Sequence, residues 1–273
     1  MLYSFDEGEM MKKFWLALAL LCFCGTVEAV VQGKEVSYEA EGVPLVGYIA
    51  YDDAITGKRP VVIVVHEWWG NDEYARKRAR MLAELGYTAL AVDMYGYGKV
   101  TSRPAEAVKL ADDLNRNVPL QLVRFKATFK FLQGQEIADA DKVAAFGYGF
   151  GGSVVLNMAR LGVHLNGVAS FHGGLVTDYP AKRGGVWGSV ISFTGEDDPL
   201  IGANRIRGFK AEMDRAKAHY RVVTYPGVKN GFTDPAADEL AKKFDLPLAY
   251  NAAADKDSWQ QATEMLREVF AAK

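Results

Sequence analysis

A glycine-rich turn between two apolar runs is the part of this sequence best suited to carry chemistry. The turn reads Gly147-Tyr148-Gly149-Phe150-Gly151; residues 143–146 before it suit a buried strand, and the apolar residues after Ser153 suit a helix. Flanking glycines let such a corner bend sharply and raise its central side chain above the sheet edge, as in the G-x-S-x-G nucleophile elbow. The central residue here is Gly149, so the sequence predicts the geometry of an elbow without a reactive atom.

The same glycines allow a second interpretation, because Gly147, Gly149 and Gly152 fit the G-x-G-x-x-G spacing of a dinucleotide-binding turn. That motif needs an acidic residue at the end of the next strand, roughly 20 residues on, to bind the ribose. The next expected strand, residues 167–171, runs into His172 and two glycines, with no carboxylate before Asp178. Nucleotide binding and a purely structural turn both remain alternatives.

The elements around this corner alternate between strand and helix. Residues 36–41 and 43–51 suit an antiparallel hairpin around Gly42, and apolar runs typical of buried strands follow at 61–65, 88–92, 143–146, 167–171, 189–193 and 220–225. Helical patterns lie between them at 74–85, twice within 104–132, after the elbow, and at 203–218. A capping box at Ser258 to Gln261 is expected to open a last helix that ends near 270. The chain is therefore predicted to be an α/β protein with a mostly parallel sheet covered by helices on both faces.

Ligands of such sheets bind outside the carboxyl ends of the strands. This rule predicts that one rim carries Glu67, Tyr95, Gly149, His172, Asp198 and Asn230. An apolar pocket there would be lined by Trp68, Trp69, Tyr95 and Tyr148, with ordinary core packing as the other explanation of these aromatic residues. His66 and Ser153 are expected to be structural. We expect no metal, because neither His-x-x-x-His nor a close carboxylate spacing accompanies Glu67 and Asp198.

Charge and composition narrow the function classes. The 273 residues carry a formal net charge of -2 and no basic block, which argues against nucleic acid as a partner. After residue 29, the length and pattern favour a single domain over residues 30–273.

The first 29 residues are expected to be a signal peptide. Lys12-Lys13 precedes an apolar stretch at 14–24, and Val27-Glu28-Ala29 ends on a small residue, as signal peptidase sites do. Acidic residues before the basic pair are unusual in such a segment, so Met10 or Met11 is an alternative start. The apolar stretch is too short to span a bilayer, so we expect cleavage near Ala29, a periplasmic or secreted location and no stable membrane anchor.

Cleavage would also remove both cysteines, since Cys22 and Cys24 lie in the signal segment. The mature chain would then have no thiol for a disulfide, a nucleophile or a metal.

Several blocks in order along the chain resemble the dienelactone hydrolase family of the α/β-hydrolase superfamily. They are His66-Glu67-Trp68-Trp69-Gly70, Asp93 to Lys99, Gly147 to Gly152, Ser170 to Gly174, Gly195 to Pro199, and Tyr225 to Pro235. The resemblance implies the α/β-hydrolase fold and hydrolysis of carboxylic ester or lactone bonds by a Cys-His-Asp triad without a cofactor.

Carried over to this chain, the family's nucleophile position is Gly149, its histidine position is Asn230 and its acid is Asp198. The resemblance further implies that Glu67 corresponds to the residue that hydrogen-bonds the resting thiol. It also implies that the backbone N–H groups of Trp68 and Phe150 form the oxyanion hole. Only the acid of the triad is retained.

Glycine has no atom to attack a carbonyl, and an asparagine amide does not titrate near neutral pH. The sequence therefore predicts an exported, catalytically impaired relative that retains a pocket for a small ester- or lactone-like ligand. One alternative is an active ester or lactone hydrolase in which His172 or Glu67 serves as a non-standard base. The other is nucleotide binding through the glycine-rich turn.

Overall fold

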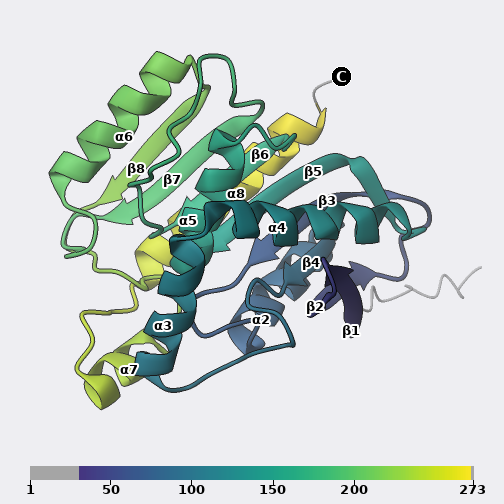
Figure 1. Cartoon of the computed structure of the whole chain (residues 1–273), viewed down its shortest axis with the longest axis horizontal. Coiled ribbons are helices and arrows are strands. Elements are labelled where there is room, and N and C mark those ends of the chain that lie inside the picture. The colour runs from purple at the N-terminus through teal and green to yellow at the C-terminus, as the bar shows by residue number, and fades with distance from the viewer. Residues whose placement is uncertain (1–30, 272–273) are drawn as a thin grey trace, which may run out of the picture.

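The computed structural model describes residues 31–271, so the expected signal peptide lies outside the described residues. An eight-stranded sheet runs through the molecule in the order β1-β2-β4-β3-β5-β6-β7-β8 (Figure 1). Its strands are β1 (Val31–Ala40), β2 (Val43–Asp52), β3 (Arg59–Val65), β4 (Thr88–Val92), β5 (Ala138–Tyr148), β6 (Gly167–Phe171), β7 (Ser189–Gly195) and β8 (Tyr220–Tyr225).

The sheet is antiparallel only at its first edge. β1 and β2 form the expected hairpin, and β2 also pairs antiparallel with β4. All later neighbours pair in parallel, from β4 and β3 through to β8. The predicted mostly parallel α/β sheet is therefore confirmed, and the carboxyl ends of β3 to β8 meet at one edge.

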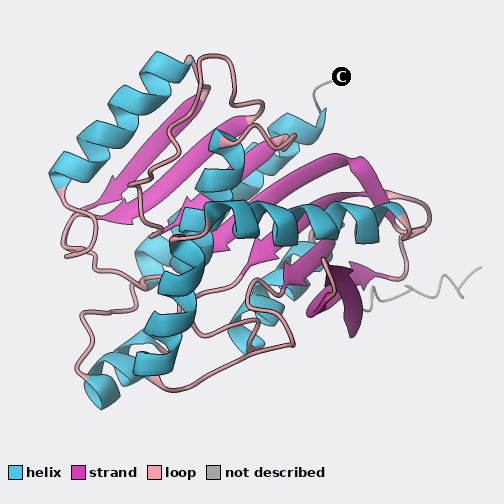
Figure 2. Ribbon diagram, in the orientation of Figure 1, coloured by secondary structure: helices cyan, strands magenta, loops and turns pink. Residues whose placement is uncertain are grey.

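Helices cover both faces of the sheet (Figure 2). They are α2 (Glu73–Glu84), α3 (Pro104–Asn115), α4 (Val118–Gln133), α5 (Phe150–Arg160), α6 (Ala203–Ala216), α7 (Ala237–Phe244) and α8 (Ala252–Ala271). Alternate residues of β3 show how the layers form: Ile63 packs with apolar residues of α3 to α6, whereas Val62 and Val64 pack with those of α2 and α8. A strand buried on both faces needs the unbroken apolar run that the sequence has.

One expectation about the helices was wrong, and one helix was missed. The last helix begins at Ala252, and Ser258 lies inside it, where its hydroxyl donates to the carbonyl of Asp255 at 3.0 Å instead of capping an end. The Oδ1 of Asn251 accepts from the amide of Ala254 at 3.0 Å and satisfies the first turn of that helix. A capping-box pattern within a helix cannot be told from a true start by spacing alone. The short helix α7 was not predicted.

Candidate functional site at the elbow

The turn after β5 has the backbone of a nucleophile elbow. Gly149 is the N-cap of α5 with φ 51° and ψ -113°, a conformation that costs side-chain-bearing residues free energy. Its amide donates to the carbonyl of Phe171 at 2.9 Å, which fixes the turn against β6. The neighbouring glycines are required by close approach, because a Cβ on Gly147 would lie 2.1 Å from the carbonyl oxygen of Gly151.

Two buried side chains face the bare α-carbon of Gly149. A Cβ built there would lie 2.8 Å from Oε2 of Glu67 and 3.7 Å from Nδ1 of His172. Glu67 follows β3 and His172 follows β6, so the predicted rim does bring these two residues together. The Glu67 carboxyl group therefore borders the space that a nucleophile's side chain would enter.

The expected acid and the residue at the histidine position are paired. Asn230 donates from Nδ2 to Oδ2 of Asp198 at 2.7 Å and to the carbonyl of His172 at 3.3 Å. The other oxygen of Asp198 accepts from the amide of Leu200 at 2.8 Å. Both side chains are buried, and burial raises the pKa of Asp198 even though the Asn230 hydrogen bond acts to lower it.

Glu67 is the most strongly perturbed carboxyl group facing the elbow. Burial raises its pKa to about 8, and the negative charges of Asp234 and Asp72 add to this effect. Its Oε1 has no hydrogen-bond partner among residues 31–271. Glu67 is therefore largely protonated at neutral pH and can donate a hydrogen bond.

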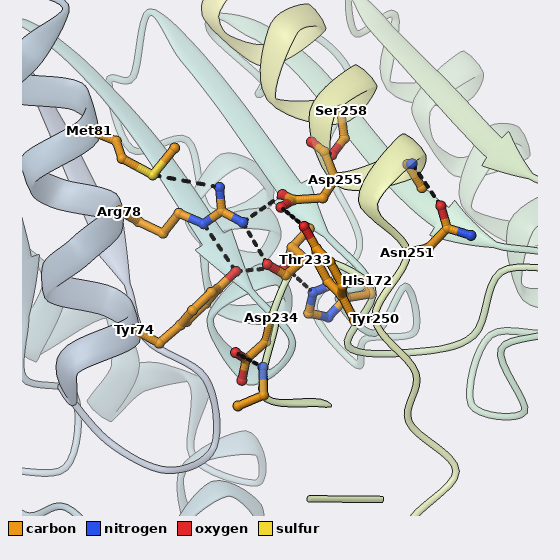
Figure 3. Close-up of polar contacts among 12 residues, drawn as sticks. Tyr74, Arg78, Met81, His172, Thr233, Asp234, Tyr250, Asn251, Asp255 and Ser258 are labelled. Carbon is orange, nitrogen blue, oxygen red and sulfur yellow. Dashed lines mark hydrogen bonds and ion pairs between the residues drawn. The ribbon is translucent and has the colours of Figure 1, made fainter. Parts of the chain in front are cut away.

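His172 is held by a chain of polar groups that the sequence reasoning missed (Figure 3). Its Nε2 lies 2.8 Å from Oγ1 of Thr233, which lies 2.7 Å from the Tyr74 hydroxyl. Arg78 donates from Nε to that hydroxyl at 3.2 Å and from Nη2 to Asp255 at 2.6 Å. Two sequence features could have indicated these contacts. Tyr74 and Arg78 are four residues apart within α2, and Thr233 lies in the block from Tyr225 to Pro235 that resembles the family.

His172 is neutral in this setting. Burial, reinforced by the positive charge of Arg78, lowers its pKa to about 3. Its Nε2 lies 3.6 Å from Oε1 of Glu67, but with an uncharged ring this contact is not an ion pair. His172 also has φ 41°, an unusual backbone conformation for a β-carbon-bearing residue that directs its carbonyl to Asn230.

Trp68 and Phe150, whose amides are expected to form the oxyanion hole, directly follow Glu67 and Gly149 in the chain. Phe150 is the first residue of α5, and the first amides of a helix have no intrahelical acceptor. Because the N-cap residue is Gly149, no side chain caps these amides either. The Tyr95 hydroxyl donates to the carbonyl of Trp68 at 2.9 Å and fixes the loop after β3. The Tyr95 ring packs against Phe150 at 5.3 Å.

The aromatic residues predicted to line a pocket do not all do so. Tyr148 is fully buried and stacks on Phe171 at 4.6 Å, so core packing explains it. Trp69 lines a cavity of about 660 Å³ on the same rim, between the loops after β3, β4 and β8. Other walls of this cavity come from Tyr74, Asp234 and Phe244.

His66 and Ser153 have structural partners. His66 is buried and its Nε2 accepts from the amide of Met94 at 3.2 Å. The Ser153 hydroxyl accepts from the amide of Gly174 at 2.8 Å.

Within residues 31–271, no group of three or more His, Cys, Asp or Glu side chains is arranged to hold a metal ion. No helix in that range combines the length and apolarity needed to cross a bilayer.

The sequence model of the dienelactone hydrolase family matches residues 45–270, which is most of the chain. This chain belongs to the dienelactone hydrolase family. The solved structure of a dienelactone hydrolase-like promiscuous phosphotriesterase from metagenomic libraries superposes with a TM-score of 0.82 at 31% identity, covering 88% of this chain and 98% of its own.

Two further similar proteins share a smaller part of their sequence with this chain. A putative carboxymethylenebutenolidase of Yersinia pestis is 27% identical over 83% of this chain and 85% of its own length. A putative dienelactone hydrolase from Klebsiella pneumoniae has a TM-score of 0.73 at 21% identity, covering 88% of this chain and 99% of its own, and supports the fold alone. The expected α/β-hydrolase fold and family membership are thus confirmed.

Proposed function

We propose that this protein is an exported dienelactone hydrolase family member that binds a small ester- or lactone-like molecule without hydrolysing it through a Cys-His-Asp triad. The observation that carries the proposal is Gly149: its backbone has the elbow conformation, while the space of the missing side chain faces Glu67 and His172. The retained N–H groups at the start of α5 support binding of a carbonyl oxygen.

Acyl transfer by the triad route needs a nucleophile and a base that takes its proton. Gly149 supplies no nucleophile. Asn230 fills the histidine position and keeps Asp198 hydrogen-bonded, but its amide does not exchange protons near neutral pH. An oxyanion hole and binding alone give roughly 10³ to 10⁴-fold acceleration over water, far below the rate of a working hydrolase.

A water-activating Glu67 is the second candidate, because the carboxyl group faces the empty position and burial raises its pKa to about 8. At pH 9 its carboxylate could take a proton from a water molecule at the elbow. His172 is a weaker choice as the base, since its Nε2 is occupied by Thr233. Nucleotide binding would need an acidic partner near the end of β6, where His172 stands.

The direct test uses the purified chain without residues 1–29, assayed at pH 7 and pH 9. The substrates are p-nitrophenyl butyrate and, because of the activity named for the 31%-identical relative, a p-nitrophenyl phosphotriester. We expect at most the roughly 10³ to 10⁴-fold acceleration over water that an oxyanion hole and binding alone provide. Turnover that is abolished by Glu67→Gln would favour the second candidate, and rapid turnover that survives both Glu67→Gln and His172→Ala would refute the proposal.

Export needs its own test, which the N-terminal sequence motivates. The full-length chain should be expressed in a Gram-negative host, and the intact mass of the periplasmic product measured. A product beginning near residue 30 is expected. A cytoplasmic product that retains Lys12 and Lys13 would contradict export.

A further inference from the structure

The cavity beside Trp69 has aromatic and aliphatic walls. Its volume is about 660 Å³, and its lining residues come from the loops after β3, β4 and β8 and from helices α2 and α7. The ring centroid of Trp69 lies 6.4 Å from that of Phe244 at the end of α7. Tyr74, Val100 and Leu240 add further apolar surface. These walls suit a molecule with an apolar body.

The wall at Trp69 is fixed by the backbone. The amide of Thr101 donates to the carbonyl of Trp69 at 2.9 Å, and Gly70 pairs with Val100 in an isolated antiparallel bridge. The wall formed by α7 is held less firmly, because Ala237 is the one buried residue of that helix. The cavity thus combines a rigid wall with a helix that can move to admit a molecule.

Two carboxyl groups that line the cavity have no cationic partner. One oxygen of Asp72 accepts from the amides of Tyr74 and Ala75 at 3.1 and 3.3 Å, which caps α2. One oxygen of Asp234 accepts from the amide of Ala236 at 2.9 Å (Figure 3). Neither aspartate forms an ion pair within residues 31–271. A carboxylate accepts several hydrogen bonds, so both retain capacity for a donor from a ligand.

The two aspartates also repel each other. Burial raises the pKa of Asp72 to about 6, and the negative charge of Asp234 adds to this effect, while the amides of the helix cap act to lower the pKa. Burial likewise raises the pKa of Asp234, which the positive charges of Arg78 and Lys77 act to lower. Asp72 is therefore mostly ionised at pH 7, and a cation beside the pair would offset the repulsion.

The cation that fits this cavity is organic. A metal ion needs several ligands, and no group of three or more His, Cys, Asp or Glu side chains in the described part of the chain is arranged to hold one. An ammonium group needs fewer partners, and the faces of aromatic rings attract it. Lys243 shows this attraction, since its Nζ lies 5.0 Å from the centroid of the Phe244 ring.

The other charged side chains of the cavity do not change the sign of the site. Glu73 is exposed and paired with Arg80, and Lys77 and Lys243 are exposed. Water screens exposed charges strongly, whereas the two aspartates are half-buried and act at lower dielectric. The aspartates therefore dominate the interaction with a charge inside the cavity.

We propose that this cavity binds a primary organic ammonium compound, with its charge at Asp72 and Asp234 and its apolar body against Trp69 and Phe244. The inference goes beyond the proposed function and does not depend on it, because the elbow residues 147–151 do not line this cavity.

The test is titration calorimetry of the purified protein with three probes of similar shape: 2-phenylethylammonium, 2-phenylethanol and 3-phenylpropionate. At pH 7 the ammonium should bind about tenfold or more tighter than the alcohol, because only the ammonium makes hydrogen bonds between charged groups. The propionate should bind most weakly, since the aspartates repel it. Equal affinity for ammonium and alcohol, tighter binding of the propionate, or no binding of millimolar ammonium would overturn the proposal.

The affinity for 2-phenylethylammonium should depend on pH. The charged or titratable groups around the two aspartates are Glu67 after β3, Glu73, Tyr74, Lys77 and Arg78 in α2, Lys243 in α7 and Asp255 in α8. An alkylammonium stays charged below about pH 9, so a change in acid reports the carboxyl groups. Affinity should rise about tenfold from pH 5 to pH 7 as Asp72 ionises at about 6. Constant or falling affinity over this range would contradict the proposal.

Isosteric variants test the two carboxylates. Asp72→Asn and Asp234→Asn remove the charge but keep an oxygen that can accept from the same amides. Each should lower ammonium affinity about tenfold at pH 7, and Asp72→Asn should flatten the pH profile. The matched control is Glu239→Gln, which removes an exposed carboxylate of α7 outside the cavity and should change affinity less than about twofold. Unchanged affinity in both asparagine variants, or an equal loss in the control, would overturn the assignment.

Two further measurements locate the bound ammonium. Lys243→Gln removes a like charge from the face of Phe244, so affinity should rise about twofold or more, and a fall would count against the proposal. In ¹⁵N NMR spectra, the indole signal assigned through its loss in Trp69→Phe should shift when 2-phenylethylammonium is added. Binding that leaves this signal unmoved would place the ligand elsewhere and overturn the inference.

Discussion

Nδ2 of Asn230 lies 2.7 Å from Oδ2 of Asp198. In a catalytic triad the acid accepts a hydrogen bond from the base and orients it. Asparagine reproduces that hydrogen bond and fills the space, so Asp198 keeps a partner although it is almost fully buried. Asn230 therefore satisfies the buried acid without supplying a proton carrier.

Glu67 should make the stability of the protein fall with rising pH. Its pKa is raised in the folded state, from 4.5 to about 8, so its contribution is complete below pH 4.5 and is lost as pH approaches 8. Glu67→Gln should remove that part of the slope and stabilise the protein at pH 9 by several kcal/mol relative to the unchanged chain. Urea unfolding at pH 5, 7 and 9 measures this. Parallel curves for the two proteins across that range would contradict the raised pKa.

The ion pair between α5 and α6 should be essential for stability. Arg160 donates to both oxygens of Glu212 at 3.0 Å, and the two side chains are 1% and 10% exposed. Arg160→Met should cost about 3–5 kcal/mol, because it leaves a buried carboxylate without its partner. The control is Lys109→Ala, which breaks the exposed Lys109–Asp113 pair and should change stability by less than about 1 kcal/mol. Similar losses in both variants, measured by urea unfolding, would show that burial is not the cause.

Two glycine-to-alanine changes in helices should act in opposite directions. A Cβ on Gly151 in α5 would lie 2.2 Å from the carbonyl oxygen of Val65, so Gly151→Ala should destabilise by about 3 kcal/mol or more. An added Cβ on Gly208 in α6 meets nothing within 4 Å, and Gly208→Ala should stabilise by about 0.5–1 kcal/mol. The urea midpoint, at an unchanged m-value, measures both. A tolerated Gly151→Ala would mean that the turn is looser than its contacts indicate.

The sequence was enough to predict the sheet and the elbow because both depend on local patterns. The strands at 88–92, 167–171 and 220–225 have the bounds that their apolar runs predicted. The helix start at Ser258 was wrong because the choice between two polar residues, Asn251 and Ser258, depends on where α8 meets the sheet.

The candidate site was predictable only in part. Position in the chain predicted that Gly149, Asp198 and Asn230 lie at one rim, since each follows a strand that ends there, and the family resemblance supplied their expected roles. The hydrogen bonds that join Arg78 and Tyr74 to Thr233 connect segments more than 150 residues apart. No local sequence pattern contains such contacts. The raised pKa of Glu67 likewise depends on burial by distant segments.

The most direct test of the account is restoration of the two missing groups. Gly149→Cys returns a nucleophile, whose Cβ requires the flexible end of the Glu67 side chain to move and whose backbone keeps an unfavourable positive φ. Asn230→His returns a base beside Asp198. The double variant should raise kcat/KM for p-nitrophenyl butyrate about 10³-fold or more over the unchanged protein, well beyond either single variant, because nucleophile and base act as a unit. A folded double variant no faster than the unchanged protein would contradict the claim that this site is a hydrolase elbow lacking only those two groups.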